Sequence, residues 1–344
     1  MSENARSEAP PGSNPQQTYP PPHSYPLAVR DHGFATALGL LMQSLSYSLA
    51  RLGLELAFTL GGIVWLVVAI GGAAWLGTHI AQAFGWVWFI GCAVGIGWFW
   101  GTVLRYMLHL VDCGHVAVLT DLIIHGRVGN GDESMFAYGK RITLQRFGQV
   151  NALFALNALV RGVVQAFHGT LDWIAGMIPI PGLDSVSGVV NLIIRAATRY
   201  IDKVILSYSL ARGDNDAWSE AREGIIYYCQ NAKPILKTSI WIVILERGLS
   251  VLVWILLMVP AAGLTVMLPQ AVRETGAIIT VVIAIMLAAA VRNAFVKPIF
   301  LIMMMIRFHT LIEGQPINAS WNDYLASISD KFREIGRGAA AAAA

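Results

Sequence analysis

Long apolar stretches alternate with polar segments along this chain. Residues 56–76 and 84–104 contain no Asp, Glu, Lys, Arg or His side chain, and each stretch is long enough to cross the roughly 30 Å hydrocarbon core of a bilayer as a helix. Two later stretches, residues 239–264 and 276–296, are each interrupted by a single pair of adjacent charged or amide side chains. The pattern therefore predicts four transmembrane helices.

The middle of the chain has a different pattern. Residues 150–178 and 186–206 are partly apolar, but they carry seven charged or histidine side chains and flank the turn sequence PIPGLDS. We expect a helical hairpin that crosses the membrane or enters it partway, with its polar faces toward the bundle interior. Residues 34–50 suit a helix that lies along the bilayer surface or leads into the first span. The predicted fold class is an all-α polytopic membrane bundle with four to six transmembrane helices and additional interfacial amphipathic helices.

The composition agrees with a membrane protein. Of the 344 residues, 56% are hydrophobic and 13% are charged, whereas soluble domains have about 25% charged residues. Residues 1–27 are rich in proline and poor in apolar side chains, which predicts a disordered tail. Residues 338–344 form a low-complexity alanine tail. Residues 28–337 are expected to form a single transmembrane helical domain.

The distribution of basic residues predicts the orientation. The loop around His79, after the first apolar stretch, contains no Lys or Arg, whereas Arg105, Lys140, Lys297 and Arg307 follow the second and fourth stretches. Because cytoplasmic loops retain an excess of Lys and Arg, both termini are expected in the cytoplasm and the loop at His79 outside. The expected location is a membrane, specifically the bacterial inner membrane.

Glu246 is the deepest acidic residue of the apolar stretches. An ionisable group at that depth costs about 2.5–3.5 kcal/mol on insertion scales. Glu246 either lines a solute pathway, where it would bind a cation or relay a proton, or it forms a buried ion pair. Arg292, Arg195 and Arg161 are the candidate partners, and pairing is the favoured interpretation because the chain contains several arginines in apolar surroundings.

Ligand-type side chains are densest directly after the second apolar stretch. His109 precedes Asp112 by three residues and Cys113 by four, so that a helix would place them on one face, and His115 follows Asp112 by three. This spacing provides only part of a metal-ligand set. A polar seam on an interfacial helix is the favoured interpretation, and a metal site is the alternative.

Four tryptophans mark the ends of the second apolar stretch. Trp86 and Trp88 lie near one end, and Trp98 and Trp100 lie near the other. The two pairs are about 18 Å apart along a helix, which suits anchoring at the two membrane interfaces. A cage for a quaternary ammonium group would need several rings at the same depth.

The same stretch contains Gly91, Gly95, Gly97 and Gly101. Small residues four positions apart allow another helix to approach closely in lipid. We expect these glycines to form a helix-packing face, with a partner helix either in the same chain or in a second protomer.

No catalytic or cofactor motif is present in the sequence. It has no HExxH, GxSxG or Walker-type motif, and none of the three cysteines, Cys92, Cys113 and Cys229, has CxxC spacing. We therefore predict no catalytic residue and no cofactor, and an enzyme is not expected. Nucleic acid is not an expected partner either.

The second half of the chain contains several short motifs. They are a tyrosine-containing segment at Tyr208 that ends at Gly213, the run Glu220-Ala221-Arg222, the sequence GIIYYCQ before Asn231, and TLIE at residues 310–313. With these motifs, residues 145–315 resemble the carboxy-terminal half of the choline transporter-like family, and they also resemble uncharacterised bacterial membrane proteins. The first resemblance implies a membrane transporter.

Two functional hypotheses follow. In the first, the protein is a transporter or permease for a small amphiphilic or cationic solute, with Glu246 and the polar central helices along the pathway. In the second, it is a non-catalytic scaffold or accessory subunit of a larger membrane complex. The expected partners are membrane lipids, and either other proteins or a second copy through the glycine-lined helix faces.

Overall fold

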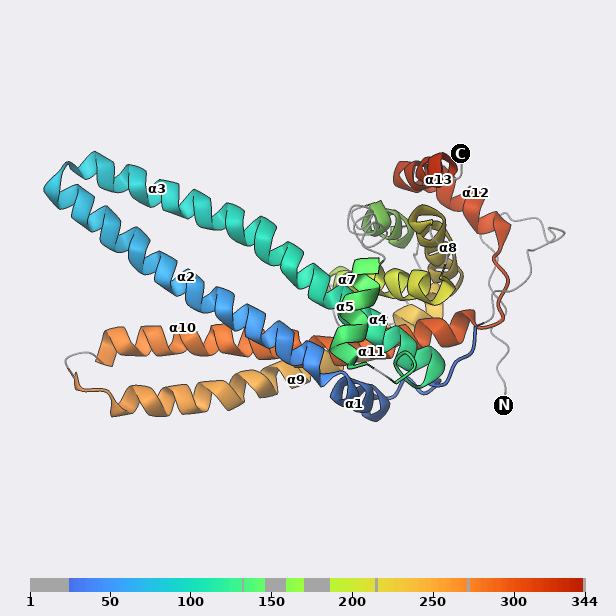
Figure 1. Ribbon diagram of the computed structural model, residues 1–344, viewed down its shortest axis with the longest axis horizontal. Helices are drawn as coiled ribbons and strands as arrows, with labels where there is room; N and C mark the ends of the chain where they lie inside the picture. Colours follow the sequence, from blue (N-terminus) through green and yellow to red (C-terminus); the bar gives the residue numbers. More distant parts are fainter. Residues whose placement is uncertain are drawn as a thin grey trace. The chain divides into compact units, whose positions relative to one another are not determined.

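A computed structural model describes residues 25–131, 133–145, 159–169, 186–213, 216–270 and 273–342 of the chain (Figure 1). These residues form helices and contain no strand, which confirms the all-α fold class. Residues 1–24 of the predicted tail and the turn at residues 179–185 lie outside the described residues.

The chain divides into two compact units, each built from segments that are distant in the sequence. The hairpin unit consists of Leu45–Asp112 and Leu249–Lys297, and the head consists of Met1–Ser44, Cys113–Gly248 and Pro298–Ala344. The head is therefore interrupted twice along the chain, each time by a segment of the hairpin unit. The division falls inside the continuous helices α4 (Arg105–His125) and α9 (Ala232–Met267).

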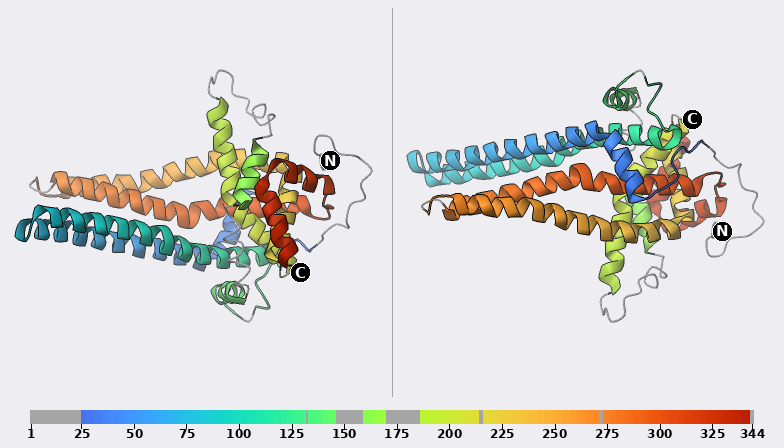
Figure 2. Two further views of the ribbon diagram at one scale, coloured as in Figure 1. Left: turned by 90° about the horizontal axis from the view of Figure 1, so that it is seen from above. Right: turned by 90° about the horizontal axis from the view of Figure 1, so that it is seen from below.

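The hairpin unit contains two helical hairpins whose tips lie at the same end (Figures 1 and 2). Each hairpin has one long first arm and a second arm that continues into a five-residue π-helical segment. The first hairpin is formed by α2 (Leu45–His79), α3 (Gln82–Phe99) and η1 (Trp100–Leu104). The second is formed by the end of α9 with α10 (Arg273–Val291) and η4 (Arg292–Val296).

Four helical stretches among the described residues are long and apolar enough to cross a membrane. They are Leu45–His79, Gln82–His125, Ala232–Met267 and Gly276–Ile312. They contain the four stretches that the hydrophobic pattern predicts, and in the most apolar window of each of the first three only 6% of the residues are buried. Apolar side chains that are exposed along a whole helix require lipid around them. The chain is therefore an integral membrane protein.

Glycines and aromatic side chains hold α2 against α3. Gly85 lies so close to α2 that a Cβ atom there would come within 2.5 Å of the Ala73 carbonyl oxygen. The Trp65 indole donates a hydrogen bond to the Cys92 carbonyl oxygen at 3.1 Å. Phe58 stacks on Phe99 with ring centroids 5.8 Å apart. Close backbone approach and interlocked rings are the usual means of packing helices in lipid, where no water drives them together.

The head has the buried apolar core of a globular domain. Its remaining helices are α1 (Phe34–Gln43), α5 (Met135–Gln145), residues 159–168, α7 (Val186–Arg212), α8 (Ala217–Gln230), α11 (Lys297–Ile312), α12 (Ala319–Ile328) and α13 (Asp330–Ala342). Helix α11 is buried along nearly its whole length, including its three consecutive methionines. The predicted central segment therefore contributes α7 to this core, and α7 is not among the four candidate spans.

Capping residues set where the helices of the head begin. The Asp216 carboxylate accepts hydrogen bonds from the backbone N–H groups of Trp218 and Ser219, at 3.1 and 3.2 Å, at the start of α8. Asn318 accepts one from the Ser320 N–H at 2.9 Å at the start of α12. Such caps satisfy backbone donors that have no partner within the helix.

Candidate functional site

Glu246 is buried in an ion pair inside the head. It lies on α9 with 3% of its surface exposed, and Arg199 Nη1 on α7 donates to its two carboxylate oxygens at 2.7 and 2.9 Å. The Tyr200 hydroxyl donates to the same carboxylate at 3.2 Å, and burial, with the charge of Glu246 second, raises the pKa of this tyrosine. A buried carboxylate is tolerated when an opposite charge and further hydrogen bonds compensate its lost hydration.

The predicted pairing of Glu246 agrees with this geometry, and the observed partner Arg199 is not among the predicted ones. Arg161 instead pairs with Asp202, Nη2 to Oδ2 at 3.3 Å. Arg292 lies in η4 of the hairpin unit. The side chain of Arg195 lies outside the described residues. Arg199 lies one helical turn after Arg195 on α7, and the hydrophobic pattern alone does not single it out as a partner of Glu246.

Four side chains from four separate segments of the chain form a buried hydrogen-bond chain, which we call the buried relay. Tyr25 Oη lies 2.5 Å from His309 Nδ1, and His309 Nε2 lies 2.7 Å from Ser207 Oγ. Ser207 Oγ in turn lies 2.8 Å from Thr120 Oγ1. Tyr25 precedes α1, Thr120 is on α4, Ser207 is on α7 and His309 is on α11. The relay therefore joins the parts of the head that the two hairpins separate in the sequence.

Ser207 and His309 have the distance of a nucleophile and its general base. Hydrolysis also needs open space beside the hydroxyl for the substrate. Both side chains have 0% of their surface exposed. The arrangement therefore suits a fixed structural contact, in which each buried polar atom has a partner.

An extended segment before α1 is fastened across the head. The backbone N–H groups of Ala28 and Val29 donate to carbonyl oxygens in the last turn of α4, at 3.0 to 3.1 Å. Arg30 Nη2 donates to Glu313 at 2.6 Å, just after α11. Together with Tyr25, these contacts fix residues 25–30 to α4 and α11. The carbonyls at the end of α4, which have no partner within the helix, thereby gain donors.

Carboxylates join α7 to α8. The Tyr208 hydroxyl donates to Glu223 at 2.8 Å, and Arg212 pairs with the same carboxylate at 3.0 Å. The Ser209 hydroxyl donates to Glu220. Burial raises the pKa of Tyr208, with a further contribution from Glu223, so the phenol stays protonated and remains a donor.

A second buried histidine connects residues 159–168 to α8. His168 Nε2 lies 3.0 Å from the Tyr228 hydroxyl, and the neighbouring Phe167 packs edge-on against Trp321 of α12. Burial lowers the pKa of His168 to about 4. The imidazole is therefore neutral at physiological pH.

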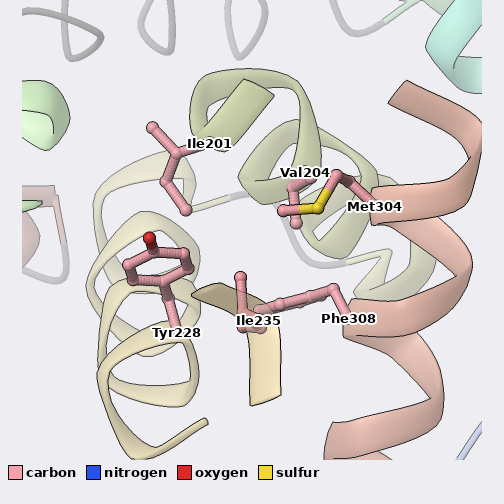
Figure 3. Close-up of a pocket in the computed structure, with 6 residues that line it drawn as sticks. All are labelled: Ile201, Val204, Tyr228, Ile235, Met304 and Phe308. Atoms are coloured by element: carbon pink, nitrogen blue, oxygen red, sulfur yellow. The ribbon is translucent and has the colours of Figure 1, made fainter. Parts of the chain in front are cut away.

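A small apolar hollow lies between α7, α8, α9 and α11 (Figure 3). Its lining side chains point toward one another, and they are Ile201, Val204, Tyr228, Ile235, Met304 and Phe308. The space between them does not admit a water molecule. The hollow is therefore a packed interior and gives no room for a solute.

A polar cluster lies within the hairpin unit. Arg51 on α2 pairs with Asp112 on α4 and with Glu55 at 3.3 Å. Asn293 Nδ2 of η4 donates to Glu55 at 3.1 Å. The three charged side chains are 11% to 15% exposed. The cluster joins the two hairpins, because α2 belongs to the first and η4 to the second.

The predicted metal candidates do not form a metal site. In the part of the chain that the structure describes, no three His, Cys, Asp or Glu side chains come together as ligands, and this includes His109, Asp112, Cys113 and His115. Asp112 pairs with Arg51, and His115 Nε2 lies 2.9 Å from Ser44 Oγ. These polar side chains connect helices.

The four tryptophans of the second apolar stretch divide into two that contact α2 and two that are largely exposed. Trp88 and Trp100 pack on α2, over Gly72 and Gly62 respectively, while Trp86 and Trp98 are 61% and 68% exposed. One tryptophan at each end therefore remains available for an interface, which still fits anchoring.

The glycines that hold the hairpin together are different from those that the spacing indicates. A Cβ atom on Gly91, Gly97 or Gly101 would meet nothing within 4 Å, and one on Gly95 would only touch Trp65 at 3.7 Å. Close approach occurs instead at Gly85 on α3 and at Gly62 and Gly72 on α2. The predicted four-residue spacing therefore does not mark the contact within the hairpin.

Comparison with known proteins gives no relative. The chain matches no family model, no curated protein and no solved structure. The motifs that resemble the choline transporter-like family contribute side chains to contacts between helices of the head. Arg222 Nε donates to Asn322 at 3.0 Å, and Asn231 Nδ2 donates to Gln315 at 2.7 Å.

Several of these side chains could not be selected from the sequence. Arg199, Ser207 and His309 belong to helices far apart in the chain, and only the fold brings their partners to them. A weak signal exists in two places: the sequence SYS at 207–209 and the lone histidine after LIMMMIRF both place polar groups in apolar helices. Buried polar groups need partners, but pattern alone does not name them.

Proposed function

We propose that this chain is a non-catalytic membrane scaffold or accessory subunit. In this proposal, two apolar hairpins cross the bilayer, and the head presents surfaces to partner proteins. The observation that carries the proposal is the contact between Glu246 and Arg199. An acidic group that serves a solute must be free to exchange partners, whereas Glu246 is held by an arginine and a tyrosine on one helix.

The packing of the head supports the same proposal. Its buried relay, its carboxylate contacts and its apolar hollow each use side chains to join helices, and the hollow has no room for water. A domain whose helices are joined by buried polar contacts is suited to holding a partner in a fixed position.

Transport of a small amphiphilic or cationic solute is the second candidate. The cluster of Arg51, Glu55, Asp112 and Asn293 favours it, because charged side chains inside membrane helices commonly mark ion or substrate pathways. The resemblance to the choline transporter-like family points in the same direction.

The two candidates differ in what Glu246→Gln does. For a scaffold, we expect the variant to lose about 1–3 kcal/mol of stability, because a buried charged hydrogen bond is removed, and its unfolding temperature in detergent should fall. Proteoliposomes that contain the unsubstituted chain should take up labelled choline no faster than protein-free vesicles. Glu274→Gln, at the exposed start of α10, is the matched control and should leave stability unchanged.

The scaffold proposal is wrong if the unsubstituted chain shows saturable choline uptake that Glu246→Gln abolishes without lowering the unfolding temperature. Purification of the native assembly in mild detergent gives an independent test. We expect companion proteins in a fixed ratio to the chain, and a chain that is recovered alone at every detergent concentration contradicts the proposal.

A further inference from the structure

Helix α1 exposes an apolar face. Phe34, Leu38 and Met42 lie four residues apart and are 39%, 39% and 59% exposed, and Ala35 and Gly39 lie on the same exposed face. The ten residues of the helix contain no charged side chain. A helix on the surface of a soluble domain presents polar side chains toward water. The outward face of α1 therefore needs an apolar cover.

The opposite face fixes how α1 is rotated. Ala37, Leu40 and Leu41 are 0%, 5% and 2% exposed. Just after the helix, Ser44 Oγ donates to the Leu40 carbonyl oxygen at 3.0 Å and lies 2.9 Å from His115 Nε2 on α4. Because this side is packed and hydrogen-bonded to the head, α1 cannot turn its exposed apolar residues inward.

The position of α1 in the chain identifies the cover. The helix ends at Gln43 and the membrane-spanning α2 begins at Leu45, so Ser44 alone separates them. Ten residues make a helix of about 15 Å, roughly half of what crosses the hydrocarbon core. Because α1 directly precedes a span, the acyl boundary of the membrane interface is the apolar environment nearest to it in the chain.

We propose that α1 lies in the bilayer interface and inserts Phe34, Leu38 and Met42 among the lipids. The partner is the lipid surface itself, which continues the lipid contact of the four spans. This inference requires only that the chain is embedded in a membrane, so it stands whether the protein is a scaffold or a transporter.

Depth-dependent fluorescence quenching tests the proposal on the full chain. Met42→Cys and Leu38→Cys are labelled with an environment-sensitive fluorophore and reconstituted into phosphatidylcholine vesicles. Ser327→Cys, an exposed position on α12, is the control. The native cysteines are buried, and the unsubstituted chain gives the background labelling.

Lipids that carry a nitroxide near the headgroup end of the acyl chain should quench the labels at positions 38 and 42 by about two-fold or more, because an interfacial helix buries its apolar face about 5–10 Å deep. Aqueous iodide should quench the label at position 327 and have little effect on the other two. The proposal is overturned if iodide quenches all three labels equally, since α1 would then face water. It is also overturned if neither quencher reaches positions 38 and 42, since protein would then cover the face.

Discussion

Individual buried side chains in the head act mainly as connections between helices. Glu246 and Arg199 join α9 to α7, and His168 and Tyr228 join residues 159–168 to α8. The energetic role of such pairs is asymmetric. Each pair adds little net stability when it is intact, but the loss of one partner leaves the other buried without compensation.

His168 makes stability depend on pH. Its pKa is lowered by burial from 6.5 to about 4, so between these values the unfolded chain binds a proton that the folded chain does not bind. The stability contribution is fully present above pH 6.5 and falls as the pH decreases toward 4. By pH 5 the loss should be about 2 kcal/mol, which is measurable as a lower unfolding temperature in detergent.

His168→Gln provides the matched comparison for this pH dependence. The amide can keep a hydrogen bond to Tyr228 but does not titrate, so the variant should lose less stability than the unsubstituted chain between pH 7.5 and pH 5. Other titrating groups contribute equally to both proteins. If the stabilities of the two proteins fall in parallel as the pH decreases, protonation of His168 costs the folded chain no stability. That result would contradict the burial of His168.

Among the elements, the arms of the first hairpin depend on one close backbone contact. Gly85→Ala should push α3 away from α2, because the added Cβ atom would lie 2.5 Å from a carbonyl oxygen. Overpacking of this kind costs about 1–3 kcal/mol. Thermal unfolding in detergent measures the effect.

Gly91→Ala on the same helix is the control, since its Cβ atom would meet nothing within 4 Å. Both substitutions raise helix propensity by the same amount, so their difference isolates the contact. If Gly91→Ala destabilises the protein as much as Gly85→Ala does, the glycine that matters lies on the face that the four-residue spacing predicts.

The sequence predicted the elements better than their partners. The four apolar stretches are long and unambiguous, so the spans could be placed from hydrophobicity. The central residues 186–206 form α7, which packs in the head and is not among the four candidate spans, and their entry into the membrane stays a prediction. Apolar helices of a globular core and of a membrane have similar composition, and the difference appears only when the partners of Ser207 and Tyr208 are known.

The candidate site was predicted in part. Glu246 stood out because a single acid in a long apolar stretch is costly, and its pairing with an arginine could be anticipated. That this arginine would be Arg199 depends on the rotation of α7 about its axis. The relay of Tyr25, His309, Ser207 and Thr120 could not be predicted, because its members are separated by 87 to 284 residues.

For the whole molecule, the two interruptions of the head require an even number of membrane crossings in each. The segments before α2, between α4 and α9, and after α10 can join one head only if each hairpin returns to the side from which it left. We therefore predict that both hairpin tips lie on one side of the membrane and the head segments on the other.

Labelling of intact cells with a membrane-impermeant maleimide checks this topology. Ile80→Cys and Gln270→Cys, at the two exposed hairpin tips, should react from outside. Ser327→Cys on α12 should react only after permeabilisation. Labelling of one tip but not the other from outside would mean that the head segments lie on opposite sides of the membrane.

The late position of α11 in the chain affects how the protein can be made. This helix fills the core of the head, yet it follows the fourth span, so the ribosome produces it after both hairpins have been synthesised. Until then α7 and α8 expose the apolar surfaces that α11 will cover. The core of the head therefore cannot be completed before the second hairpin has been synthesised.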